Sequence, residues 1–157
     1  MIDIGVEQLS FHYESEMHID RLLKKIKRNG IKAGIALNPS TSINVLDYIL
    51  DSCDFVLLML INPGFAEDSD ERQVPYAVKK VSDCSNYLRL QGCNIPFEID
   101  GRISIDRIPY FICAGADTLV LGRTSLFEKG SNLAQNFQRI KAAVREGLER
   151  KPTYELS

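Results

Sequence analysis

The stretch Cys53–Glu71, CDFVLLMLINPGFAEDSDE, begins as a nearly unbroken apolar run and ends in turn-forming and charged residues. A short apolar run that stops at a turn signal is typical of a strand buried on both faces of a parallel sheet. An earlier segment, IKAGIALNPSTS at 31–42, follows the same plan and turns at Asn38 and Pro39. Two strands that end alike predict two strand tips on one edge of a sheet or barrel, where parallel α/β folds carry their chemistry.

Strand-like and helix-like segments alternate outward from this stretch. Strands are predicted at 6–14, 31–38, 54–62, 96–100 and 117–122, and helices at 18–30, 42–53, 74–91, 104–115 and 132–148. Strands separated by helical crossovers pair in parallel, so their carboxyl ends lie on one side. The pattern predicts a single domain over 1–157 with five parallel strands, and periodicity alone leaves open whether the sheet closes.

The bulk composition is that of an ordinary globular domain. The 157 residues are 45% hydrophobic and 25% charged, with a formal net charge of -2. This balance does not favour nucleic acid or an anionic membrane as a partner. No apolar run is long enough to span a bilayer, and we expect a cytoplasmic protein whose four cysteines are reduced thiols.

Five motifs resemble the ribulose-phosphate 3-epimerase family, and they occur in the family's order over nearly the whole chain. They are FHYESEMHIDRLLKKIKRNG at 11–30, GIKAGIALNPST at 30–41, FVLLMLINPGF at 55–65, FEIDGRIS at 97–104 and CAGADTLVLGRTSLF at 113–127. The resemblance implies an incomplete TIM (β/α)8 barrel that starts at about the fourth strand. It also implies that the family's serine, its H-x-D and its H-L-M motifs on the first three strands have no counterpart here.

The resemblance implies a role for Asp100, at the end of PFEID. It corresponds to one of two aspartates that act as opposed acid and base and that, with two histidines, hold a divalent metal. Asp100 is thus expected to be a catalytic residue and a metal ligand, although Asp-Gly after a strand also suits a plain turn. Only this member of the set has a counterpart in the chain, and the metal's identity does not follow from the sequence.

The same resemblance implies a phosphosugar pocket at the strand ends. The expected substrate and phosphate residues are Met59, Gly64, Phe65, Gly101, Gly122 and Arg123. Three departures bear on the phosphate: Ala66, Glu67 and Asp68 stand in place of the family's Gly-Gly-Gln, Arg102 replaces a second glycine, and Arg123 replaces a serine. Acidic side chains oppose phosphate binding, whereas a guanidinium favours it. His12 is expected to be a hydrogen-bonding residue near the site, and Asn38 either lines the pocket or caps its turn.

The resemblance implies two alternative functions. The first is metal-assisted C3 epimerisation of a ketose phosphate, D-ribulose 5-phosphate to D-xylulose 5-phosphate, through an enediolate. The second is an inactive phosphosugar- or anion-binding remnant of that family. Five of eight strands leave two open edges, so we expect a homo-oligomer or a complementing chain as partner.

Overall fold

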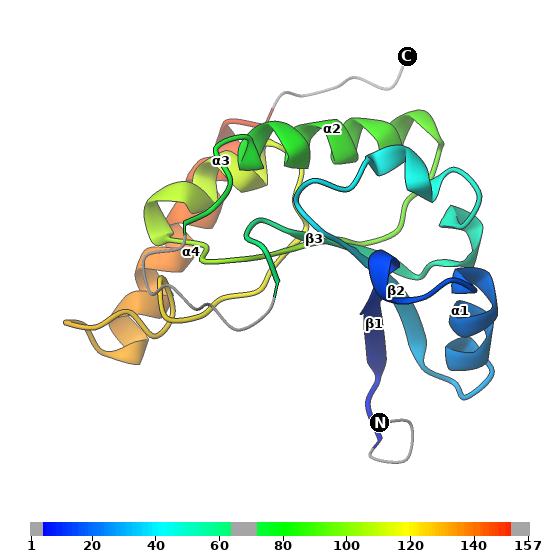
Figure 1. Cartoon of the computed structure of the whole chain (residues 1–157). Coiled ribbons are helices and arrows are strands. Elements are labelled where there is room, and N and C mark those ends of the chain that lie inside the picture. The colour runs from blue at the N-terminus through cyan, green and yellow to red at the C-terminus, as the bar shows by residue number, and fades with distance from the viewer. Residues whose placement is uncertain (1–4, 64–71, 152–157) are drawn as a thin grey trace.

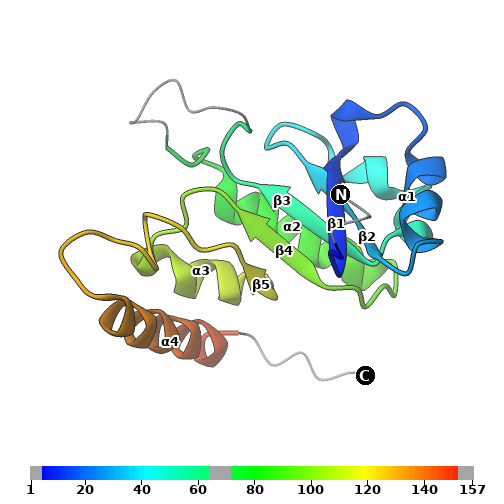
Figure 2. The same cartoon turned by 90° about the horizontal axis from the view of Figure 1, so that it is seen from below.

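The computed structural model describes residues 5–63 and 72–151, and five parallel strands form one sheet in chain order (Figures 1 and 2). The strands are β1 (Gln8–His12), β2 (Lys32–Leu37), β3 (Phe55–Met59), β4 (Phe97–Asp100) and β5 (Thr118–Leu119). Each strand pairs with the next one along the chain. The predicted parallel alternation is confirmed, and all five strand ends lie on one edge.

In the part of the chain that the structure describes, four α-helices connect or follow the strands. They are α1 (Ile19–Lys27), α2 (Ala77–Leu90), α3 (Ile108–Cys113) and α4 (Leu133–Glu149). In Figure 1, α1 lies beside β2 at one end of the sheet, and α3 and α4 lie together at the other. Pro109 occupies the first turn of α3, where its missing N–H costs nothing. Asn132 and Gln135 form a capping box that starts α4.

The predicted helix at 42–53 is wrong. The segment forms two short 3₁₀ turns, η3 (Ile43–Leu46) and η4 (Leu50–Ser52), and Ser42 caps the first of them as predicted. Its β-branched residues and its asparagine and aspartates are weak helix formers, so nothing local sustains an α-helix. Two further 3₁₀ turns, η2 (Tyr13–Ser15) and η5 (Ile105–Arg107), follow β1 and precede α3.

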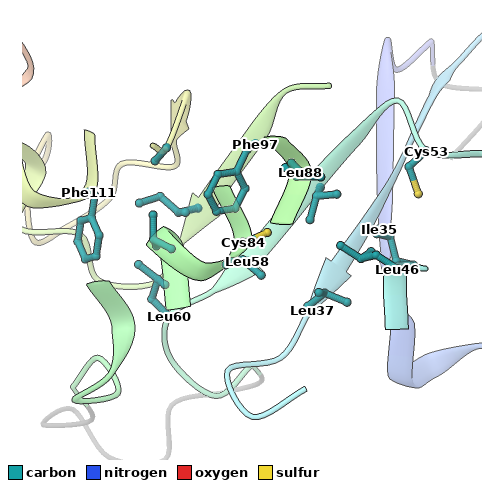
Figure 3. Packing of buried hydrophobic residues seen from close by; sticks show 14 of the residues in the cluster. Ile35, Leu37, Leu46, Cys53, Leu58, Leu60, Cys84, Leu88, Phe97 and Phe111 are labelled. Atoms are coloured by element: carbon teal, nitrogen blue, oxygen red, sulfur yellow. The ribbon is translucent and has the colours of Figure 1, made fainter. Parts of the chain in front are cut away.

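Side chains point alternately to the two faces of the sheet along each strand. One face carries Ile35 and Leu37 of β2, Leu58 of β3, and Phe97 and Ile99 of β4, all buried in the hydrophobic core. Figure 3 shows Leu88 and Cys84 of α2 beside Phe97 and Leu58. Burying this face under the helices supplies the hydrophobic stabilisation of the fold.

The opposite face would line the inside of a closed barrel. It carries Gly34 and Ala36 of β2, Phe55, Leu57 and Met59 of β3, and Glu98 and Asp100 of β4. The side chain of Gln8 on β1 hydrogen-bonds to Glu98 on β4. Since β2 and β3 lie between these strands, the contact indicates that the sheet bends across this face. We call this surface the inner face.

The sheet is not closed. Within the described residues, β1 and β5 each pair with one neighbour and lie at opposite margins (Figure 2). The predicted incomplete barrel with two open edges is therefore confirmed. No helix in the described ranges is long and apolar enough to cross a membrane.

Candidate functional site

The carboxyl ends of β3 and β4 place two expected site residues side by side. Met59 ends β3 and Asp100 ends β4, and the two are partners in the parallel register. Both lie on the inner face and both are half-buried. The structure thus brings together the carboxylate and the thioether that the sequence assigned to one pocket.

Asp100 lies in an environment that favours its protonated form. Burial raises the pKa of its carboxyl above the ordinary value of 3.8, and a hydrogen bond with the Gly101 backbone opposes part of this rise. A carboxyl with a raised pKa can hold a proton nearer neutral pH than an exposed aspartate can. Such a group is suited to proton transfer at the end of a barrel strand.

Gly101 cannot be replaced without moving the backbone. Its φ is +125°, and a Cβ there would lie 2.9 Å from the backbone nitrogen of Ile61. The carbonyl of Asp100 accepts a hydrogen bond from the Leu60 amide at 2.7 Å, and the Gln73 side chain donates to the Gly101 carbonyl at 2.7 Å. The turn after Asp100 therefore packs directly against the end of β3.

Arg102 adopts a backbone conformation that favours glycine. Its φ of +46° is the one positive value for a non-glycine residue in the described ranges. A left-handed conformation costs an ordinary L-residue about 1–2 kcal/mol. This is where the family motif has its second glycine, so the backbone keeps the glycine-like shape while the side chain is a guanidinium.

The loop after β5 lies close to the loop after β4. The Thr124 hydroxyl donates to the Ile103 carbonyl at 3.0 Å, which ties the two loops together one residue away from Arg123 and Arg102. The Gly122 carbonyl accepts from the amide of Phe127 at 3.0 Å and closes a compact turn. Gly101, Gly122 and the two arginines are therefore gathered at one corner of the carboxyl edge.

Asn136 of α4 supports this corner from behind. Its side-chain amide donates to the carbonyls of Leu126 and Glu128, both at 3.2 Å, and it is almost fully buried.

Two other expected residues, Gly64 and Phe65, lie outside the described residues.

Sequence reasoning missed a buried lysine that binds the loop 38–41, which follows β2. We call its three hydrogen bonds to this loop the charge clamp. The ammonium of Lys80, on α2, donates to the carbonyls of Asn38 (2.8 Å), Pro39 (2.5 Å) and Thr41 (2.7 Å). Lys80 is only 8% exposed, and burial lowers its pKa below the ordinary value. One signal was available, because Lys80 falls on the apolar stripe of α2.

Glu14 holds the same loop from the other side. Its carboxylate accepts hydrogen bonds from the Asn38 amide at 3.1 Å and from the Thr41 hydroxyl. Burial alone would raise the pKa of Glu14, but these hydrogen bonds outweigh burial and the pKa falls below 4.5. The other carboxylate oxygen lies 3.6 Å from Nδ1 of His12, which is beyond hydrogen-bond distance. This buried nitrogen has no hydrogen-bond partner among the described residues, so the hydrogen-bonding role expected of His12 stays a prediction.

The described residues do not fit a divalent metal. In the ranges 5–63 and 72–151, no three His, Cys, Asp or Glu side chains come together in a way that could hold an ion. A lone aspartate does not hold a hard cation tightly, because such sites use several oxygen or nitrogen ligands. We therefore derive no chemical step through a metal.

Parallel strands with helical connections and an inner face define a TIM-barrel type of α/β fold. Known structures support this class: 3-hexulose-6-phosphate synthase from Salmonella typhimurium aligns with 94% of this chain and 64% of its own, with a TM-score of 0.66 and 11% identity. Thiamine phosphate pyrophosphorylase from Pyrococcus furiosus aligns with 94% of this chain and 66% of its own, with a TM-score of 0.63 and 15% identity. At these identities the likeness concerns the fold alone.

Sequence comparison identifies the family. The model of the ribulose-phosphate 3 epimerase family matches residues 1–127. The ribulose-phosphate 3-epimerase of Buchnera aphidicola subsp. Acyrthosiphon pisum is 37% identical over 145 residues, which are 92% of this chain and 60% of that protein. The Escherichia coli K12 enzyme of the same name is 37% identical over 125 residues, or 80% of this chain and 54% of its own. The chain belongs to the ribulose-phosphate 3-epimerase family, and it spans little more than half the length of these relatives.

Proposed function

We propose that the chain acts on a phosphorylated ketose and transfers a proton at C3, as in the conversion of D-ribulose 5-phosphate to D-xylulose 5-phosphate. The observation that carries this proposal is the position of Asp100, a half-buried carboxyl on the inner face at the end of β4, whose pKa burial raises. Family membership supports the reaction class, and the relatives' names supply the substrate.

The chemistry requires a base beside C3 of the sugar. Removal of the C3 proton moves its electron pair into a C2–C3 double bond and leaves the charge on the C2 oxygen. Return of a proton to the opposite face of C3 inverts that carbon. Asp100 supplies the group on one face, and Met59, its partner in the register, offers a polarizable surface for the flat intermediate.

The corner of the two loops is the proposed phosphate site. The space beside the Gly122 backbone is open, whereas that beside Gly101 is filled by the end of β3. The exposed Arg123 offers a guanidinium that can pair with a dianion. We include Gly64 and Phe65 in this site on the strength of the family motif. A divalent cation is the family's implied cofactor, and with Asp100 as its one matching residue here it would need ligands from beyond the described residues.

A second function is favoured by one specific observation. The described residues bring no metal-holding group together, which favours binding of phosphosugars without turnover. The open edges of β1 and β5 further suggest a partner, either another copy or a complementing chain.

Solvent exchange at C3 tests the proposal. The purified chain is incubated with D-ribulose 5-phosphate in D₂O, with and without added Mg²⁺, and deuterium at C3 is followed by NMR. We expect exchange that is lost in Asp100→Asn and kept in Asp106→Asn, which alters an exposed aspartate. A folded chain that exchanges nothing but binds the sugar phosphate would establish the second function instead.

A further inference from the structure

We infer that the side-chain amide of Asn38 binds the C1 hydroxyl of the sugar and so selects ketose phosphates that carry this group. The inference rests on the proposed function, because that function supplies the sugar and its direction across the site. Asn38 follows directly on β2 and precedes Pro39. The sequence leaves open whether Asn38 lines the pocket or caps its turn, and the structure separates the two roles.

Asn38 lies in one row with Met59 and Asp100 across the inner face. A residue before proline is restricted to extended conformations, so Asn38 continues β2 and alternation directs its side chain to the inner face. The register pairs Leu37 with Leu58. Its next step sets Asn38 beside Met59, which pairs in turn with Asp100. Neighbouring strands lie about 4.8 Å apart, so the backbones of Asn38 and Asp100 lie about 10 Å apart with Met59 between them.

Other groups of the protein hold the backbone of Asn38, and its side-chain oxygen takes no part. The Asn38 amide donates to the Glu14 carboxylate at 3.1 Å. The Asn38 carbonyl accepts from the Lys80 ammonium at 2.8 Å and from the Thr41 amide at 3.1 Å. An asparagine that caps a turn accepts a backbone N–H with Oδ1, but Oδ1 of Asn38 has no hydrogen-bond partner among the described residues. Glu14 and the charge clamp therefore hold this turn, and the Asn38 side chain does not cap it.

The unpaired oxygen is the feature that points to a ligand. Oδ1 is buried, and a buried acceptor without a partner destabilises the fold, so native structures keep few of them. Asn38 as a whole is half-exposed, and the terminal torsion of an asparagine is broad, so its amide can turn and present either end to a ligand. A hydroxyl both donates and accepts, and it can therefore pair with either end of the amide.

The position of the phosphate decides which hydroxyl of the sugar this is. The strands lie in the order β2, β3, β4, β5, and the proposed phosphate site lies at the loops after β4 and β5. A ketose phosphate that is held there at C5, with C3 at Asp100, extends its C1 end away from this corner toward β3 and β2. Asn38 lies in that direction, one strand beyond Met59. The bend that brings Gln8 to Glu98 also shortens the distance across this row.

A pair of unreactive probes isolates the contact. D-ribitol 5-phosphate and its 1-deoxy analogue both lack the carbonyl and cannot form an enediolate, and they differ only in the C1 hydroxyl. The affinity of each probe is measured by calorimetry for the wild-type chain, for Asn38→Ala and for Asn44→Ala. Asn44 is the matched control, because it is exposed and lies on η3, just after the same loop.

One neutral hydrogen bond corresponds to an affinity change of roughly 3- to 10-fold. We therefore expect the wild-type chain and Asn44→Ala to bind D-ribitol 5-phosphate about 3- to 10-fold more tightly than the 1-deoxy probe. Asn38→Ala should bind both probes alike, with the affinity that the wild-type chain has for the 1-deoxy probe. A residue that only shapes the loop would weaken both probes by the same factor and leave the preference between them intact.

Three results overturn the inference: a wild-type chain that binds the two probes equally tightly, an Asn38→Ala chain that keeps the wild-type preference, and a wild-type chain that binds neither probe. The comparison of the two probes on the wild-type chain needs no variant, so it decides the matter even if Asn38→Ala fails to fold. Exchange at C3 of D-ribulose 5-phosphate reports the proposed function separately. A chain that prefers the C1 hydroxyl but exchanges nothing would keep this inference and lose the catalytic proposal.

Discussion

Lys80→Met is the perturbation that tests the charge clamp most directly. Methionine keeps the apolar stem of the side chain in the core but removes the ammonium that three loop carbonyls share. The Pro39 carbonyl lies in a buried contact, whereas those of Asn38 and Thr41 are partly accessible to water. Most of the lost stability should therefore come from the Pro39 carbonyl, and less from the carbonyls of Asn38 and Thr41.

The expected loss of stability follows from the free-energy cost of leaving a buried polar group unpaired. A buried carbonyl left without a partner costs about 1–3 kcal/mol, and hydrogen bonds to a charged donor are at the strong end. Removing a buried ammonium also relieves its desolvation, which offsets part of this loss. We expect the free energy of unfolding to fall by about 2–4 kcal/mol.

Urea denaturation followed by circular dichroism measures this loss, with Lys79→Met as the matched control. Lys79 is the neighbouring lysine of α2, but it is exposed and pairs with Asp83 one turn away. Such surface pairs contribute about 0.3–0.5 kcal/mol. A Lys80→Met chain within about 0.5 kcal/mol of Lys79→Met, the usual range of surface substitutions, would refute the clamp.

Two further predictions concern the inner face and the carboxyl edge. Gly34→Ala should lower the free energy of unfolding by about 1–3 kcal/mol through overpacking, because the added methyl would overlap the ring of Phe55. Gly122→Ala is the control, because the space beside its Cα is open. It should change the free energy of unfolding by less than about 0.5 kcal/mol in the same urea assay. Glu14→Gln should be less stable than wild type at pH 7, and the difference should shrink as the pH falls below the ordinary value of 4.5. The sign follows because folding lowers the pKa of Glu14, so its carboxylate stabilises above that range and loses this effect on protonation; a difference independent of pH would contradict the assignment.

Much of the fold could be predicted from local pattern. The apolar run at 54–62 and the short PFEID segment were predicted as parallel strands, because apolar residues occupy both faces of a strand that is buried on each side. That their tips share one edge of the sheet then followed from parallel pairing. The segment 42–53 could not be predicted in the same way, because its apolar spacing suits a helix while its residue types favour tight turns.

The candidate site, too, was predicted only where local sequence marks its residues. Asp100, Gly101 and Gly122 were predicted as site residues because motifs mark them in the sequence. Glu14 was passed over, because an acidic residue after a strand looks like any surface carboxylate. Its role depends on a loop some two dozen residues later in the chain, which only the packing of β1 against β2 brings to it.

By itself, then, the sequence determined the order of the elements, the parallel pairing and the residues at the strand tips, because these depend on neighbours within a few positions. Tertiary structure decided the rest. Lys79 and Lys80 are identical in type and adjacent in sequence, yet one faces solvent and the other anchors a loop about forty residues earlier. The bend that brings Gln8 to Glu98 likewise exists only once four strands are assembled, because curvature is a property of the sheet and no single strand encodes it.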